Sequence, residues 1–179
     1  MTKSDNLARI ITGCKAGSAE SFAQLVDVYA SRFYGYFYRL TGDKEVSDEL
    51  LSELYVKLVE KISSYKGGSF ESWLFKIATN IFHDYLRGKQ RRRKLLEVRK
   101  RQLESRKKKK EVKKSDSEIA DKLQIQLEKL DTDMRELVML RFYSQLKLKE
   151  IAEMRSEPIG TTLSRLHRGV KRLRELMER

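Results

Sequence analysis

The 179 residues, 40 % hydrophobic and 36 % charged with a single proline, leave room for one ordinary domain or two small ones and favour an all-α fold. Cys14, the one cysteine, excludes an intramolecular disulfide and a four-cysteine zinc site, which agrees with a reducing cytoplasm, and with only two histidines we expect no metal or other cofactor. The formal charge of +13 favours polyanionic partners, and the polar first residues and short apolar runs predict neither a secretion signal nor a membrane span.

Residues 7–94 are predicted to form consecutive amphipathic helices, because apolar residues recur at every third or fourth position. Ser21 is the predicted N-cap of one helix, and Gly42, which tolerates a left-handed backbone, is predicted to end it. Ser47 is predicted to open the next helix. Ser69 follows a flexible Lys-Gly-Gly turn and is the predicted cap of a helix that begins at Phe70.

Acidic and apolar residues alternate on the helix that Ser47 opens. Asp48, Glu49 and Glu53 are interleaved with leucines, and paired carboxylates are one requirement of acid–base catalysis. No histidine partner or glycine-rich phosphate loop accompanies them, so we expect no enzyme and no small-molecule substrate. A protein-docking face or a plain solvated surface are the two readings that remain.

A polar stripe is expected on the helix that begins at Phe70. It comprises Lys76, Asn80, His83 or Asp84, and Arg87, interleaved with aromatic residues. Amide, imidazole and cationic groups beside aromatic rings suit unstacked single-stranded bases, which bind by stacking and edge hydrogen bonds. On spacing alone the simpler alternative is favoured, in which the aromatic side chains only fill a core: Phe70, Trp73 and Tyr85.

The excess positive charge lies in one block. Sixteen Lys and Arg but only three Glu lie between Arg87 and Lys114, so this segment carries the whole +13 and the rest is neutral. A helical extension through Leu95, Val98 and Leu103 is one possibility, whereas residues 106–114 have too little apolar area to offset chain entropy. We predict a flexible basic linker at 95–117 that either grips a polyanion or only spans two domains.

The C-terminal residues, 118–179, are predicted to form a second small helical domain. Asp131-Thr132-Asp133 is its predicted internal cap, and apolar side chains that include Phe142 and Leu163 recur along its helices. The short helix around 149–153, a turn at 155–158 and a last helix from Ile159 have the pattern of a helix-turn-helix, whose second helix enters the major groove. An inward stripe is expected at Thr162, Leu166, Val170 and Leu173.

Outside this stripe lie hydroxyl and cationic side chains suited to phosphates and guanine edges. The alternative is an ordinary amphipathic helix with a basic surface. The residues expected to contact duplex DNA are Thr161, Ser164, Arg165, Arg168 and Lys171, with Arg172 beside them.

The order of these segments resembles the extracytoplasmic-function (ECF) sigma factors of bacterial RNA polymerase. The resemblance rests on five motifs and covers nearly the whole chain except 95–117. The motifs are Phe22-Ala23-Gln24-Leu25-Val26 with Tyr29, Tyr38-Arg39-Leu40-Thr41-Gly42-Asp43, Leu50-Leu51-Ser52-Glu53-Leu54-Tyr55, Gly68–Asn80, and Glu150-Ile151-Ala152-Glu153 with Gly160–Gly169. The family usually has glycine in the helix-turn-helix turn, where this chain has Ser156, and its linkers are not typically this basic.

The resemblance implies two domains, 1–94 and 118–179, and a chain that binds core RNA polymerase and promoter DNA and directs promoter recognition, melting and transcription initiation. It leaves open an anti-sigma protein as a further partner. The implied contacts to the polymerase clamp are Asp48, Leu50, Leu51, Glu53, Leu54 and Tyr55. Those to the melted −10 strand are Lys66, Ser69, Lys76, Asn80, Asp84 and Arg87, and the helix-turn-helix residues would read the −35 element.

Two other classes of function compete with this interpretation. One is a helix-turn-helix regulator that acts without polymerase. The other is a basic nucleic-acid packaging protein, which would bind without sequence preference and with a steep salt dependence.

Overall fold

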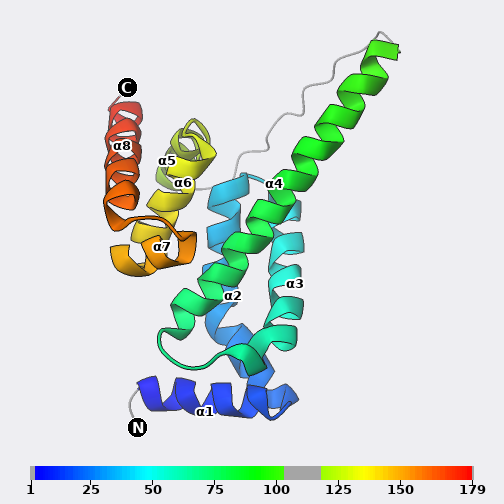
Figure 1. Ribbon diagram of the computed structural model, residues 1–179, viewed down its shortest axis with the longest axis vertical. Helices are drawn as coiled ribbons and strands as arrows, with labels where there is room; N and C mark the ends of the chain where they lie inside the picture. The colour runs from blue at the N-terminus through cyan, green and yellow to red at the C-terminus, as the bar shows by residue number, and fades with distance from the viewer. Residues whose placement is uncertain (1–2, 103–117, 179) are drawn as a thin grey trace.

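The computed structural model describes residues 3–102 and 118–178, and every regular element in these two ranges is helical, as the sequence predicts (Figure 1). The elements of the N-terminal unit are α1 (Lys3–Lys15), α2 (Ala19–Thr41), α3 (Lys44–Lys61), the 3₁₀ turn η1 (Ile62–Ser64) and α4 (Phe70–Gln102). Those of the C-terminal unit are α5 (Glu118–Glu128), α6 (Thr132–Val138), the π-helical turn η2 (Met139–Tyr143), α7 (Leu148–Arg155) and α8 (Ile159–Met177).

In the N-terminal unit α2, α3 and α4 pack side by side, and α1 lies across one end of them (Figure 1). Aromatic side chains of α2 and α4 fill the core between these helices. The rings of Phe33 and Phe75 lie 4.4 Å apart between centroids, and the buried hydroxyls of Tyr36 and Thr79 share a hydrogen bond of 3.1 Å. This satisfied polar pair fixes how α4 packs on α2, because an unpaired buried hydroxyl would be costly.

Two of the predicted helix starts are wrong, because the N-cap lies three residues before the predicted residue in α2 and four residues before it in α3. Ser18, and not Ser21, caps α2, since its backbone is extended and its hydroxyl accepts the N–H of Ser21. Asp43, and not Ser47, caps α3, and its carboxylate accepts the N–H of Val46. In each case one short polar residue lies at the N-cap and another among the first four helical residues, and local sequence does not distinguish the two positions.

The other predicted boundaries of this unit are confirmed. Gly42 ends α2 in the left-handed conformation with φ of 69°, and its N–H bonds to the carbonyl of Tyr38. Ser69 caps α4, because its hydroxyl accepts the N–H of Ser72 at 3.1 Å. The end of α2 and the start of α4 are therefore fixed by the residues that the sequence singled out.

Helix α4 extends beyond the bundle, as Figure 1 shows. The predicted helical extension occurs and runs to Gln102, so the first part of the segment 95–117 is helical; Leu103 and the residues up to 117 lie outside the described part. Leu95 and Leu96 are mostly exposed there. The basic side chains of residues 89–94 are likewise exposed, so this part of α4 carries them away from the core.

The C-terminal unit packs α5, α6 and α7 against α8 around Leu127, Leu137 and Ile151. Asp131 caps α6 as predicted. Ser156, in the turn between α7 and α8, adopts the left-handed conformation with φ of 54°, the strain expected where glycine is absent.

Two apolar residues of this unit do not face the core as expected. Phe142 is 60 % exposed and Leu163 is 53 % exposed. The π-helical turn at Met139–Tyr143 shifts the helical phase, which turns Phe142 outward. Leu163 lies next to the buried stripe of α8 and not within it.

The two units contact each other along one side of α2 and α4. Tyr143 lies against the backbone of Gly35, where a Cβ atom would come within 2.0 Å of the tyrosine hydroxyl. Arg32 donates to the carbonyl of Ser144 at 2.8 Å. Arg135 donates to the carbonyl of Leu40 at 2.7 Å, so direct hydrogen bonds join the units at both ends of this contact.

Candidate nucleic-acid interface

Helices α7 and α8, with the turn at 156–158, form the predicted helix-turn-helix. The buried side of α8 includes Thr162, Leu166 and Gly169. Gly169 lies so close to α6 that a Cβ atom added to it would be 3.3 Å from the Cβ of Met134. This packing leaves the opposite side of α8 outward. Of the predicted −35 residues, Ser164, Arg168 and Lys171 are exposed, and Thr161 and Arg165 are partly exposed.

A network of ion pairs lies behind the start of α8. Arg155 contacts Glu136 at 3.0 Å and Glu157 at 3.1 Å, and it also pairs with Asp133. Burial alone would lower the pKa of Arg155, but the three carboxylates raise it above its usual value. The guanidinium therefore stays charged and holds α6, α7 and the turn together.

Arg165 belongs to the edge of the same network. Its guanidinium donates to Glu157 at 2.8 Å and lies 3.8 Å from Asp133. Arg168 lies three residues further along the helix and projects from its exposed side. The two arginines predicted to read DNA thus differ, because one is held by carboxylates and the other extends into solvent.

A second candidate surface lies on α4. Lys76, Asn80 and Asp84 follow each other at intervals of four residues and are exposed, so they form one stripe, and Arg87 pairs with Asp84. Lys66 and Ser69 are exposed in the preceding connection, where Gly67 and Gly68 have positive φ. The structure brings all six predicted −10 residues to the surface, from one loop and one helix face.

His83 does not belong to this stripe. It is half-buried, and its Nε2 lies 2.6 Å from a carboxylate oxygen of Glu136 in α6. This hydrogen bond raises the pKa of His83, although burial and the positive charges of Arg155 and Arg87 oppose the change. Of the two alternatives that the sequence left open, Asp84 occupies the stripe and His83 joins the two units.

The aromatic residues of α4 have mixed roles. Phe70 is buried in the core, whereas Trp73 and Tyr85 are half-buried at its margin. The ammonium group of Lys89 lies 5.7 Å from the centre of the Tyr85 ring. Trp73 and Tyr85 therefore remain near enough to the surface to meet a base, whereas Phe70 does not.

A cavity of about 270 Å³ separates the start of α4 from α7, and its wall includes Ser69, Lys76 and Glu153. The Ser72 hydroxyl donates to Glu150 across it at 2.6 Å. Burial would raise the pKa of Glu150, but the hydrogen bonds from Ser72 and from the N–H of Lys147 lower it below its usual value. Carboxylates of the C-terminal unit therefore stand beside the α4 stripe in this arrangement.

The predicted docking helix α3 presents only part of its predicted surface. Leu50 and Leu54 are 3 % and 1 % exposed, so they lie in the core and cannot touch a partner while α3 remains packed. Asp48 and Glu53 are exposed, and Leu51 and Tyr55 are half-buried; the Tyr55 hydroxyl is itself buried and has no hydrogen-bond partner among the described residues.

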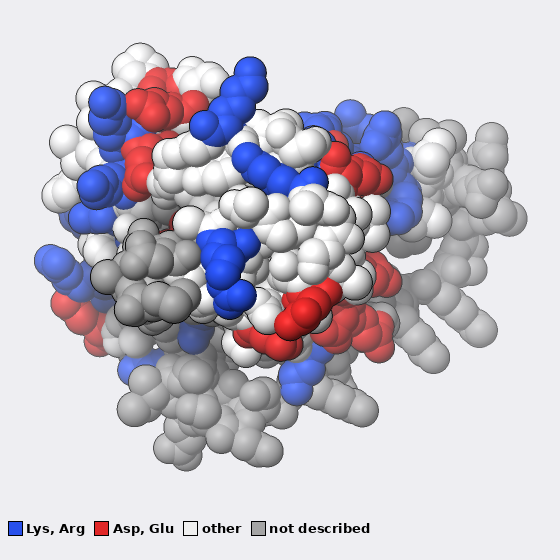
Figure 2. All heavy atoms as spheres, turned by 90° about the horizontal axis from the view of Figure 1, so that it is seen from below, with Lys and Arg blue, Asp and Glu red and all other residues white. Residues whose placement is uncertain are grey.

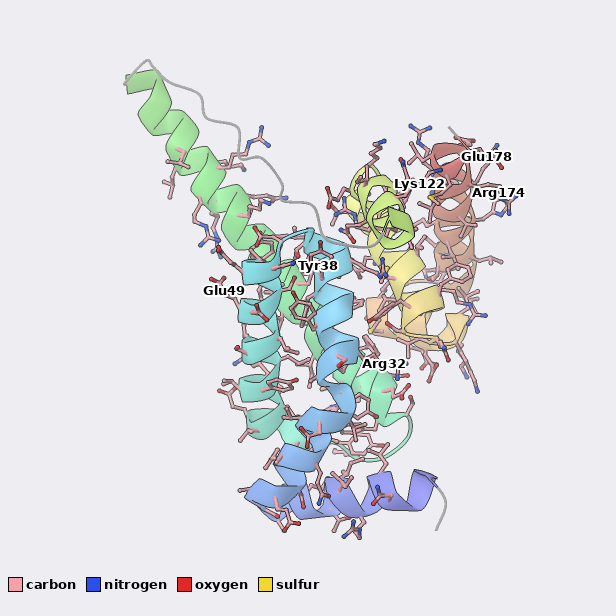
Figure 3. The ribbon with its side chains drawn as sticks, turned by 180° about the vertical axis from the view of Figure 1, so that it is seen from behind. Arg32, Tyr38, Glu49, Lys122, Arg174 and Glu178 are labelled. Atoms are coloured by element: carbon pink, nitrogen blue, oxygen red, sulfur yellow. The ribbon has the colours of Figure 1, made fainter. Side chains whose placement is uncertain are left out.

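Two further residues of this surface were not identified from the sequence. Val56 and Val59 are each more than half exposed on α3, and their only sequence signal is that they fall outside the leucine repeat of that helix. Figure 3 shows the direction of this face, because Glu49 of α3 points away from the C-terminal unit whereas Arg32 of α2 points toward it. The outer face of α3 is therefore open while the two units are packed together.

Charge is distributed unevenly over the molecule. Figure 2 looks at the end that α1 closes, and that face is largely uncharged, with separate acidic and basic groups. Within residues 3–102 and 118–178, no helix combines the length and apolar character needed to cross a bilayer.

Comparison with known families and proteins identifies both units of the chain. Residues 25–92 match Sigma-70 region 2, and residues 126–175 match Sigma-70, region 4. The ECF RNA polymerase sigma factor SigE of Mycolicibacterium smegmatis is 31 % identical over 158 residues, which cover 88 % of this chain and 62 % of that protein. SigW of Bacillus subtilis, also an ECF RNA polymerase sigma factor, is 29 % identical over 170 residues, covering 90 % of this chain and 91 % of SigW.

Solved structures share the fold. The sigma factor RpoE in complex with the anti-sigma factor NepR from Bartonella quintana aligns with a TM-score of 0.71 at 22 % identity, covering 89 % of this chain and 98 % of that one. CnrH in complex with the cytosolic domain of CnrY aligns with a TM-score of 0.67 at 19 % identity, covering 94 % and 95 %.

Proposed function

This chain belongs to the ECF sigma factors, and we propose that it binds core RNA polymerase and directs promoter recognition, melting and transcription initiation. One observation carries the proposal: Sigma-70 regions 2 and 4 follow each other in the chain, and each places an exposed polar face on its own helix. Two faces on two units suit a promoter with two separate elements. The units are proposed as domains 1–94 and 118–179, with 95–117 between them.

Helix α8 is proposed to read the −35 element as duplex DNA. Its inner side is anchored in the C-terminal core, so its outer side chains are held in fixed positions. A fixed guanidinium can meet both acceptors of a guanine edge, whereas flexible basic residues only neutralise phosphates. Thr161, Ser164, Arg165, Arg168 and Lys171 are the proposed contacts.

Helix α4 and the connection before it are proposed to bind the melted −10 strand. Asn80 offers an amide at the centre of an exposed stripe, with Lys76 and Arg87 on either side of it for phosphates. Trp73 and Tyr85 lie at the margin of the core, where a base could stack. Lys66, Ser69 and Asp84 complete the proposed site.

Docking on polymerase is proposed for the outer face of α3. The contacting residues are narrowed to those that the packed helix exposes, at least in part: Asp48, Leu51, Glu53 and Tyr55, together with Val56 and Val59. Leu50 and Leu54 would support this face from the core. Apolar side chains beside carboxylates suit an interface with a buried centre and a polar rim.

The proposed role is not enzymatic, since the chemistry of RNA synthesis would belong to the core polymerase. We place the action of the chain in the cytoplasm for the same reason, as the partner works there. Because the sigma factor RpoE in a similar solved structure is bound to the anti-sigma factor NepR, an anti-sigma protein is proposed as a further partner of this chain.

Titration of the labelled protein with purified core polymerase tests the proposal. We expect saturable one-to-one binding in the absence of DNA. A charge-reversed variant, Glu53→Lys, should bind more weakly, and Glu20→Lys, on the first turn of α2, is a matched control that should not. If the protein bound promoter DNA specifically but not core polymerase, the alternative of a regulator that acts alone would replace the proposal.

A further inference from the structure

Two large aliphatic side chains are exposed on the helix proposed to enter the major groove. Ile159 and Leu163 are 52 % and 53 % exposed, although Leu166, Val170, Leu173 and Leu176 of α8 lie in the core or pack against it. Burying such a side chain normally stabilises a protein, so half-exposed Ile and Leu on an otherwise basic surface are available for a partner.

The position of Ile159 and Leu163 on α8 indicates which partner they would contact. Four residues separate Ile159 from Leu163, so they lie on the same side of the first two turns of α8. Leu163 also adjoins the exposed Ser164 and lies one turn before His167, which is exposed as well. The N-terminal residues of a recognition helix are those that reach base edges.

The path to these side chains is open. A Cβ atom added at Gly160 would have no neighbour within 4 Å, so no other part of the described chain covers the helix at that point. Arg168 and Lys171 are exposed further along and would hold phosphates. The apolar pair is therefore continuous with the basic face proposed to contact DNA.

In the major groove the thymine 5-methyl group is the apolar feature that an aliphatic side chain can recognise; the other base edges present hydrogen-bond donors and acceptors. We propose that Leu163, supported by Ile159, packs against thymine methyl groups in the −35 element and so selects thymine there. This inference rests on the proposed function, because it requires α8 to lie in the major groove.

The same contact disfavours the other bases. An aliphatic side chain over the N4 amino group of cytosine, or over the acceptors of guanine, would displace water without replacing its hydrogen bonds. Removing one buried methyl group costs about fourfold in affinity, from about 0.8 kcal/mol per buried methylene-sized group. The predicted effect is thus small at each position but chemically specific.

Deoxyuridine substitution isolates the methyl group, because it leaves base pairing unchanged. The holoenzyme, formed from the full chain and core polymerase, would first select its preferred −35 sequence from randomised duplexes. Each −35 thymine would then be replaced singly by deoxyuridine, and the affinity measured. We expect a loss of about fourfold at one or two positions for the unmodified protein.

Leu163→Ala should abolish this difference between thymine and deoxyuridine, and Ile159→Ala should reduce it. Ile125→Ala is the matched control, because Ile125 is comparably exposed on α5, away from α8's first turns, and it should keep the full difference. Circular dichroism would verify that all three variants remain helical.

Equal affinity for thymine and deoxyuridine at every position would overturn the inference. A selected −35 sequence without thymine would do the same, as would a methyl effect that survives in both Leu163→Ala and Ile159→Ala. Failure of the proposed function gives a different result, since no preferred −35 sequence would emerge from the selection at all.

Discussion

Arg165 and Arg168 lie three residues apart on α8, and their surroundings predict different roles. The guanidinium of Arg165 is hydrogen-bonded to Glu157, whereas Arg168 extends from the exposed side. Such pairing holds a side chain in one geometry, but it also commits part of its hydrogen-bonding capacity. Arg168 therefore has the larger capacity for a guanine edge.

Replacing Arg168 with Ala should cost about 1–3 kcal/mol of discrimination between the preferred −35 sequence and a scrambled one, with no change in thermal stability. Arg165→Ala should lower discrimination and also the melting temperature, because Glu157 loses one of its partners. Competition binding and thermal melting of the two variants measure this. Equal loss of stability in both would contradict the distinction.

Arg155 is expected to be the most sensitive charged residue of the C-terminal unit. Its removal leaves the side chain of Glu136, which is 2 % exposed, without its guanidinium partner. Breaking a buried ion pair by removing one partner typically costs about 3–5 kcal/mol. Arg155→Ala should therefore lower the free energy of unfolding by about 3 kcal/mol, whereas Arg172→Ala, which breaks an exposed pair with Glu175, should change it by less than about 1 kcal/mol. Urea denaturation compares the two variants, and similar costs would contradict the prediction.

His83 is expected to make the packing of the two units depend on pH. Its pKa is raised in the packed state by the hydrogen bond to Glu136. A histidine of this kind contributes stability in full below its unpacked pKa of about 6.5, and the contribution is lost as the pH rises through the raised value. Packing should accordingly be tighter at pH 6 than at pH 8.5.

Hydrogen exchange of α6, corrected for the intrinsic rate at each pH, would measure this loosening. His83→Gln retains a hydrogen-bonding side chain without a titrating group, so its exchange should be independent of pH over the same range. An unchanged pH dependence in this variant would assign the effect to another group.

At the scale of the elements, the regular apolar period predicted the helices well, because burial of one face determines where a helix forms. It did not predict which residues cap α2 and α3, since Ser18 and Ser21, or Asp43 and Ser47, are chemically equivalent as caps. Nor did it predict that Leu163 is exposed, because the phase of a buried stripe depends on the neighbouring helices. The expected polymerase contact at Leu54, which is buried, came from the family resemblance and not from the apolar period.

The candidate sites, too, were predictable from local sequence only in part. The α4 stripe was predictable, since Lys76, Asn80 and Asp84 repeat every four residues on one helix. The links of His83 to Glu136 and of Arg165 to Glu157 were not, because they join residues brought together by the fold. Long-range pairs of this kind have no signal in local spacing.

The prediction for α4 concerns the side chain of Asn80. Recognition of an extruded base requires hydrogen bonds to its edge, and an exposed amide supplies both a donor and an acceptor. Asn80→Ala should lower transcription from a duplex promoter and relax the preference at one −10 position. On a promoter melted in advance the variant should recover most of its rate, and full activity with unchanged base preference on the duplex would contradict the role.

At the scale of the whole molecule, the two units are packed together with Glu150 and Glu153 of α7 beside the α4 stripe, while the outer face of α3 stays open. Gly35 is central to this packing, because an added Cβ would meet Tyr143. The arrangement leaves the proposed polymerase face accessible and places acidic side chains where the −10 strand is proposed to bind.

Gly35→Ala should separate the units without unfolding either. Hydrogen exchange in η2 and α7 should become faster, whereas exchange in α3 should not change. Gly160→Ala is the matched control, because its Cβ has open space, and its exchange should equal that of the unmodified protein. If Gly35→Ala left exchange in α7 unaltered, the packing at Tyr143 would not hold the units together.

The central claim is that this chain directs transcription initiation. Run-off transcription with purified core polymerase on a genomic promoter library, with and without the protein, tests it most directly. We expect transcripts that depend on the protein and start at a fixed distance downstream of shared −35 and −10 sequences. Specific DNA binding without any protein-dependent transcript would contradict the claim.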